Sequence, residues 1–204
     1  MPVARGKTSP AAVLPPASAP PVTEERAAAI KKVSPPAALG AASSTDEPRE
    51  KERLLDDVLL AHNDNDPRLD TAFLALSPET KRAFRRKYRT LPPERRNDRG
   101  TILYLLGKNL RTPEDWAVMR EAVAEPPCLS LSDCSKPPAP EEGNGEAGDA
   151  VTLAYPALVA LEQAEQALAG RDAAARQEAS AVVRAARGSR IEIVAKKADE
   201  LGSR

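Results

Sequence analysis

The densest group of reactive side chains in this 204-residue sequence is a basic block at residues 81–99. The block contains nine Lys or Arg residues and two acidic ones, so its formal charge is 9 − 2 = +7 in a chain whose net charge is zero. Guanidinium and ammonium groups bind carboxylates and phosphates. We therefore expect a partner-binding basic face made by Arg82, Arg85, Arg86, Arg89, Arg95 and Arg96.

Three interpretations of this basic face remain open from the sequence. Phe84 and Tyr88 form an apolar stripe beside the arginines, so the block could be an amphipathic helix whose solvent side is basic. The arginines could instead dock an acidic protein surface, or contact phosphates while the aromatic rings stack on bases. No known DNA-reading motif accompanies the block. Four of its arginines share a helix face at i, i+3, i+4, i+7 spacing: Arg82, Arg85, Arg86 and Arg89.

The second candidate group is the pair Cys128 and Cys134, spaced as C-x₅-C. A structural zinc site needs about four ligands, and the single histidine, His62, lies far away in the sequence. We therefore expect no metal. The two cysteines are either free thiols, as the cytoplasm would keep them, or a disulfide in an exported protein.

Catalytic patterns are absent from the sequence. His62 has no nucleophile with an orienting group near it in the sequence, and its acidic neighbours fit a helix end followed by a polar turn. The run 63–66 lacks the glycine and the distal Glu of a calcium loop. No glycine-rich phosphate loop, nucleophile elbow or zinc-protease motif occurs. The sequence predicts a protein that is not an enzyme and holds no cofactor.

The elements that must position these residues are helices. All six aromatic residues lie between Phe73 and Tyr155, which places a compact core in the middle of the chain. Apolar residues recur at helical spacing throughout this region. Three times a capping residue precedes a first-turn proline, which predicts helix starts at Asp66-Pro67, Ser77-Pro78 and Thr112-Pro113.

The fold class expected is therefore all-α, either a small antiparallel helical bundle or a short helical array. In its helix pattern and its short, proline-opened turns the chain resembles HEAT and armadillo-type arrays. Asp66-Pro67 and Thr112-Pro113 are 112 − 66 = 46 residues apart, within the roughly 40–47 residues of such repeats. The resemblance implies stacked antiparallel helix pairs. It is one of architecture, because the two units share no convincing side-chain match.

Composition divides the chain into four segments. Residues 1–46 form a disordered Pro/Ala-rich tail, because repeated prolines exclude long helices there. Residues 47–131 are the helical core domain, and residues 132–155 are a flexible linker that is rich in Pro and acidic residues. Residues 156–204 form an Ala-rich helical hairpin that packs either on the core domain or on a partner.

These features favour a non-enzymatic protein-interaction module that acts as an adaptor, a regulatory subunit or an inhibitor of a partner with an acidic surface. The alternatives are nucleic-acid binding through the basic face at residues 81–99, and an exported cell-envelope structural protein with a Cys128–Cys134 disulfide. The sequence has no apolar run long enough to span a membrane and no secretory signal, so we expect a cytoplasmic location, with the periplasm or cell envelope as the alternative. Abundant Ala and Arg hint at a GC-rich, bacterial genome.

Overall fold

The computed structural model describes residues 46–63, 65–137 and 147–203. Within these ranges the chain forms helices and no strands, which confirms the predicted all-α class. The disordered tail predicted for residues 1–46 lies outside the described residues, apart from Asp46. The helices are α1 (Glu47–Ala61), α2 (Arg68–Thr71), α3 (Pro78–Thr90), α4 (Arg96–Gly107), α5 (Pro113–Ala124), α6 (Ala147–Ala169), α7 (Ala173–Arg187) and α8 (Glu192–Gly202).

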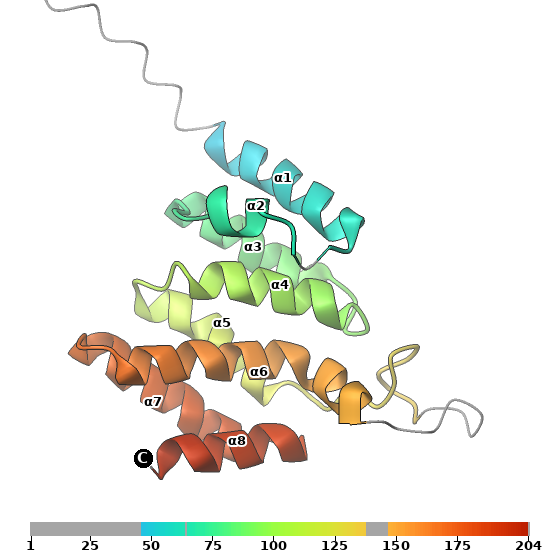
Figure 1. Cartoon of the computed structure of the whole chain (residues 1–204), viewed down its shortest axis with the longest axis vertical. Helices are drawn as coiled ribbons and strands as arrows, with labels where there is room; N and C mark the ends of the chain where they lie inside the picture. Colours follow the sequence, from blue (N-terminus) through green and yellow to red (C-terminus); the bar gives the residue numbers. More distant parts are fainter. Residues whose placement is uncertain (1–45, 64, 138–146, 204) are drawn as a thin grey trace, which may run out of the picture. The chain divides into compact units, whose positions relative to one another are not determined.

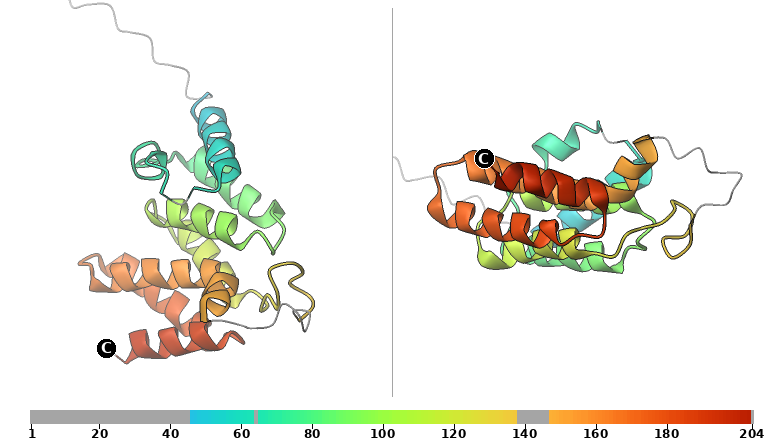
Figure 2. Two further views of the ribbon diagram at one scale, coloured as in Figure 1. Left: turned by 45° about the vertical axis from the view of Figure 1, so that its right-hand side comes forward. Right: turned by 90° about the horizontal axis from the view of Figure 1, so that it is seen from below.

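The helices from α3 onward stack in two layers (Figure 1, Figure 2). One layer holds α4, α6 and α8 side by side, and the other holds α3, α5 and α7. Consecutive helices pack against each other across the layers, as α5 does on α6 and α7 on α8. This stacking of antiparallel helix pairs is the HEAT-like arrangement expected from the sequence.

Two of the three predicted helix starts have the expected capping geometry. The Ser77 side chain accepts a hydrogen bond from the Thr80 amide at 3.1 Å and opens α3. Thr112 and Asp115 form a reciprocal capping box at the start of α5. At the third start, Asp66 accepts from the Arg68 amide at 2.9 Å, but α2 is only four residues long. The caps were predictable because each depends on a few consecutive residues.

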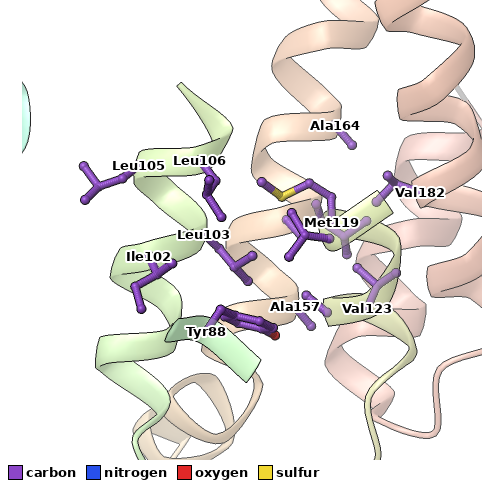
Figure 3. Close-up of a cluster of buried hydrophobic side chains, with 14 of the residues drawn as sticks. Tyr88, Ile102, Leu103, Leu105, Leu106, Met119, Val123, Ala157, Ala164 and Val182 are labelled. Atoms are coloured by element: carbon purple, nitrogen blue, oxygen red, sulfur yellow. The ribbon is translucent and has the colours of Figure 1, made fainter. Parts of the chain in front are cut away.

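One hydrophobic core runs from α1 to α8. Its aromatic part is the one expected from the sequence, since Phe73, Phe84 and Tyr88 are fully enclosed and Trp116 is nearly so. Further along the chain the core continues through small side chains. Figure 3 shows Leu103, Met119 and Val123 of α4 and α5 facing Ala157, Ala164 and Val182 of α6 and α7.

The structure differs from the predicted division at one boundary, that between the linker and the C-terminal helices, and residues 138–146 of the predicted linker lie outside the described residues. α6 begins at Ala147, so residues 147–155 are helical and do not belong to a flexible linker. Pro156 fits a first-turn proline by sequence, but it lies buried inside α6 between Ala154 and Ala157. The C-terminal helices share the core of the preceding ones, so they are part of the same compact unit.

Close contact between α4 and α6 explains this continuity. An added Cβ on Gly100 would lie 2.3 Å from the Tyr155 ring, and one on Gly107 would lie 2.4 Å from the Gln163 side chain. The two glycines lie seven positions apart on α4 and therefore face the same side of the helix. They leave room for α6 to pack directly against the α4 backbone.

Candidate functional site

Most of the predicted basic face is paired within the chain. Asp115 at the start of α5 is buried, and its carboxylate contacts Lys81 Nζ at 2.5 Å and Arg85 Nη1 at 3.0 Å. Arg89 binds Glu121 of α5 through two parallel hydrogen bonds, Nε–Oε1 at 3.0 Å and Nη2–Oε2 at 2.7 Å. These cations therefore join α3 to α5.

The other predicted face residues differ in their ion pairs and in their burial. Arg82 pairs with Glu79 on its own helix at 2.7 Å, and Arg95 pairs with Asp98 in the first turn of α4. Arg86 is exposed and has no ion pair among the described residues. The remaining member, Arg96, is 2% exposed. The structure does not bring the six arginines together on one surface.

The buried end of the basic block forms a compact ionic cluster, which we call the Arg96–Arg99 cluster. It consists of Arg96 and Arg99 at the start of α4, Glu125 at the end of α5, and Tyr88 of α3. Arg99 Nη2 pairs with Glu125 Oε1, and the Tyr88 hydroxyl donates to the same oxygen at 2.6 Å. Arg96 Nη1 lies 3.6 Å from Glu125 Oε2. Two cations thus share one carboxylate.

Arg99 is held tightly in this cluster. Its Nη1 donates to the backbone oxygens of Tyr88 at 3.0 Å and Leu91 at 3.1 Å, and its guanidinium lies 4.2 Å from the centre of the Tyr88 ring. Burial and the Glu125 charge raise the pKa of the Tyr88 hydroxyl, so Tyr88 stays a neutral donor. These contacts connect the end of α3 to the start of α4 and the end of α5.

Arg96 has fewer hydrogen-bond partners than Arg99. Burial lowers the pKa of its guanidinium, and the nearby Arg99 charge lowers it further while Glu125 opposes both. Among the described residues, its Nε and Nη2 find no hydrogen-bond acceptor, nor does Nε of Arg99. A buried donor without an acceptor costs about 1–3 kcal/mol, so unsatisfied groups of this kind are rare in folded proteins.

A cavity of about 570 Å³ lies against the cluster. Arg96, Arg99 and Glu125 line one side of it. The lining also includes residues of the disulfide loop, residues 127–135, in which Cys128 and Cys134 are bonded to each other. Of the two interpretations that the sequence left open for these cysteines, the structure adopts the disulfide.

Hydrogen bonds hold the disulfide loop in place. The Leu129 amide donates to the Cys134 carbonyl at 3.0 Å, and Ser130 Oγ donates to the Asp133 carbonyl at 2.8 Å. The Cys134 amide donates to Glu94 Oε1 at 2.9 Å, which ties the loop to the turn between α3 and α4. The loop is therefore a fixed wall of the cavity.

Exposed apolar side chains are found in this loop and in the first turns of α6. Leu129 and Leu131 are each 46% exposed, and Val151 in the first turns of α6 is 43% exposed. A second cavity of about 350 Å³ is lined by residues of the loop, of α6 and of the start of α8: Pro127, Cys128, Ala150, Leu153, Ile191, Glu192, Ile193 and Lys196. We call this region the loop–α6 apolar surface.

No catalytic arrangement stands out in the described part of the chain. His62 is exposed, ends α1 with a left-handed backbone (φ 48°), and lies 4.0 Å from Asp98. A cavity of about 610 Å³ near Trp116 and Gln163 is lined by apolar, polar and charged side chains, without a nucleophile beside a general base. Within the described ranges, no three His, Cys, Asp or Glu side chains converge as metal ligands.

Sequence reasoning missed the burial of Arg96 and Arg99. The signal was present, because Arg99 lies four residues before Leu103 and seven before Leu106, on the apolar face of the same helix. Nothing local could have identified Glu125 as their shared partner, since it belongs to another helix.

None of the described helices is both long enough and apolar enough to cross a bilayer. Comparison of the chain with known protein families, with curated proteins and with solved structures finds no match.

Proposed function

We propose that the chain is a non-enzymatic protein-interaction module that docks its partner on the loop–α6 apolar surface. The observation that carries this proposal is the position of the exposed apolar residues. Three of the five large hydrophobic side chains exposed in the described part, Leu129, Leu131 and Val151, belong to this one surface. Exposed apolar side chains that lie close together are typical of interaction sites, and we propose that these three do so.

The adjoining cavity supports the same proposal. Its volume of about 350 Å³ and its mainly apolar lining suit a large aliphatic or aromatic side chain of a partner. Glu192 and Lys196 stand among the lining residues and offer charges of both signs at the rim. The partner expected here inserts an apolar anchor, which replaces the acidic-surface partner expected from the basic block.

The internal pairing of the basic block also bears on the alternatives. Nucleic-acid binding requires cationic side chains that are free to neutralise phosphates and so release the counterions of the nucleic acid, and Arg85 and Arg89 instead bind carboxylates of α5. The disulfide favours an oxidising compartment, so it supports the exported, cell-envelope alternative over a cytoplasmic one. An adaptor, regulatory or inhibitory role remains our proposal for either compartment.

The test is capture of a partner by matched variants. The double variant Leu129→Asp, Leu131→Asp places charges on the surface, and Leu60→Asp, at a residue 78% exposed on α1, is the control. We expect the wild type and the control to capture the same stoichiometric protein from nuclease-treated native lysate, and the double variant to lose it. Equal capture by all three proteins would remove this surface from the proposal.

A further inference from the structure

We propose that the cavity of about 610 Å³ near Trp116 and Gln163 binds a small uncharged molecule through a cyclic amide group, in which an N–H and a C=O lie side by side. A cavity of this volume suits a compact organic ligand. None of the residues of the loop–α6 apolar surface lines it, so the site can be tested without a protein partner. Two buried polar side chains whose polar atoms have no partner carry the proposal.

The cavity lies where the ends of α4 and α6 meet the starts of α5 and α7. Trp116 of α5 and Gln163 of α6 are the two buried residues of its lining, 4% and 7% exposed. Gly107 of α4 also lines the cavity, and a Cβ added to it would lie 2.8 Å from Gln163 Oε1. The Gln163 amide therefore lies beside Gly107, in space that a larger residue there would fill.

The polar atoms of Trp116 and Gln163 are unpaired and accessible. Within the described part of the chain, neither the Gln163 amide nor the Trp116 indole N–H makes a hydrogen bond. The polar side-chain atoms there that are both fully enclosed and without a partner belong to Arg96 and Arg99, so those of Gln163 and Trp116 keep accessible surface. Both residues line this cavity and neither of the other two cavities described above. Polar groups of buried side chains are normally hydrogen-bonded, so two unpaired ones at one cavity indicate a ligand.

The Gln163 amide favours a particular kind of ligand. A primary amide presents an N–H and a C=O side by side along one edge, and such an edge can pair with a complementary one through two hydrogen bonds. An ordinary peptide bond is trans, so its N–H and C=O point in opposite directions and offer one hydrogen bond to that edge. An amide in a small ring is held cis and presents both groups together. The indole N–H of Trp116 is a further donor, for a second carbonyl oxygen of the ring.

The charged residues of the lining favour an uncharged ligand. Their formal charges cancel, since two are cationic and two acidic: Arg111, Arg171, Asp172 and Glu178. The first three are exposed, and Glu178 pairs with Arg120 at 2.5 Å. A charged ligand would therefore meet no net opposite charge in the cavity, and the buried part of the lining is uncharged.

The experiment uses the single tryptophan of the chain, whose indole N–H gives one cross-peak in a proton–nitrogen correlation spectrum of the full-length, disulfide-bonded protein. Uracil, a nucleobase, and cyclo(glycyl-glycine), a peptide-derived ring, are titrated separately. We expect a saturable shift of this cross-peak with at least one of them, and the tighter binder identifies the source of the ligand. The N-methylated form of the ring that binds lacks the N–H donors and should bind about tenfold more weakly or worse. No saturable shift with either ring, or equal binding of a ring and its N-methylated form, overturns the proposal.

Matched variants test the Gln163 edge itself. Gln163→Met keeps a similar shape without the edge, so we expect a loss of affinity of about tenfold or more. Glu162→Met introduces the same side chain at the neighbouring, exposed position of α6 and should leave the affinity within about twofold. The comparison of a ring with its N-methylated form uses the wild type alone, so it decides the test if Gln163→Met fails to fold. Equal affinity of the wild type and a folded Gln163→Met would refute the assignment.

Discussion

The two ends of the stack are held together by different means. Between α3, α4 and α5 the contacts use aromatic rings and buried ion pairs, such as Lys81 and Arg85 with Asp115. Between α6, α7 and α8 the buried side chains are mostly alanine and valine, for example Ala160 and Val182. Small side chains let helices approach closely and gain dispersion contacts along their backbones. An alanine-rich helix can therefore be as much a part of the core as an aromatic one.

The largest effect on stability should come from breaking the ion pairs of Asp115 with Lys81 and Arg85, which join α5 to α3. Asp115→Ala leaves the Lys81 and Arg85 charges without their carboxylate and also removes half of the capping box. Loss of one member of a buried pair costs about 3–5 kcal/mol. Chemical denaturation should show this loss, and Glu79→Ala, which breaks an exposed pair on α3, should change stability by about 1 kcal/mol at most.

The Asp115 carboxylate also makes the stabilisation by these ion pairs depend on pH. Burial raises the pKa of Asp115, but hydrogen bonds from Lys81 and from the Arg111 and Thr112 amides outweigh burial and hold this pKa below its ordinary value. The stabilisation is therefore complete above the pKa of the unfolded carboxyl, about 3.9, and is lost as pH falls through the lower folded value. Below that range the difference between wild type and Asp115→Ala should shrink, and a constant difference would contradict this account.

The close packing of α4 on α6 should be broken by a single methyl group. Gly100→Ala places a Cβ against the Tyr155 ring, and overpacking of this kind costs about 1–3 kcal/mol, against a gain in helix propensity of about 1 kcal/mol at most. Thermal melting should show a net loss. Gly188→Ala is the matched control, since its Cβ would lie an ordinary 3.5 Å from its nearest neighbour. A loss of equal size at both positions would mean that backbone freedom, and not packing, decides the effect.

The smallest expected effect comes from opening the disulfide loop. Cys128 and Cys134 are six positions apart, and closing so short a loop contributes about 2 kcal/mol in the chain-entropy account. Reduction with a thiol should lower the stability by that amount or less and leave the helical content unchanged. A loss of helical signal would show that the loop supports the stack more widely than its contacts indicate.

The sequence predicted the features that depend on neighbouring residues. Ser77 and Thr112 could be identified as caps because the atoms they bind lie within three residues. The start of α6 at Ala147 could not be predicted in this way. The residues before Pro156 resemble a linker in sequence, but they are helical in the structure, where Tyr155 packs against Gly100 of α4. The ion pairs of Arg96 and Arg99 could not be predicted either, because their shared partner Glu125 follows another helix, α5.

Contacts between neighbouring helices also have a consequence for how the chain folds. Packing joins helices that are adjacent or next but one in the sequence, as for α4 with α6 and α6 with α8. Such a low contact order favours rapid folding, because little loop-closure entropy is lost before contacts form. Structure can begin at one helix pair and spread to the next, as in a one-dimensional chain of coupled units. Among the described helices, α1 and α8 lie at the two ends of the stack, so they then open more readily than the centre, and their backbone amides exchange with solvent first.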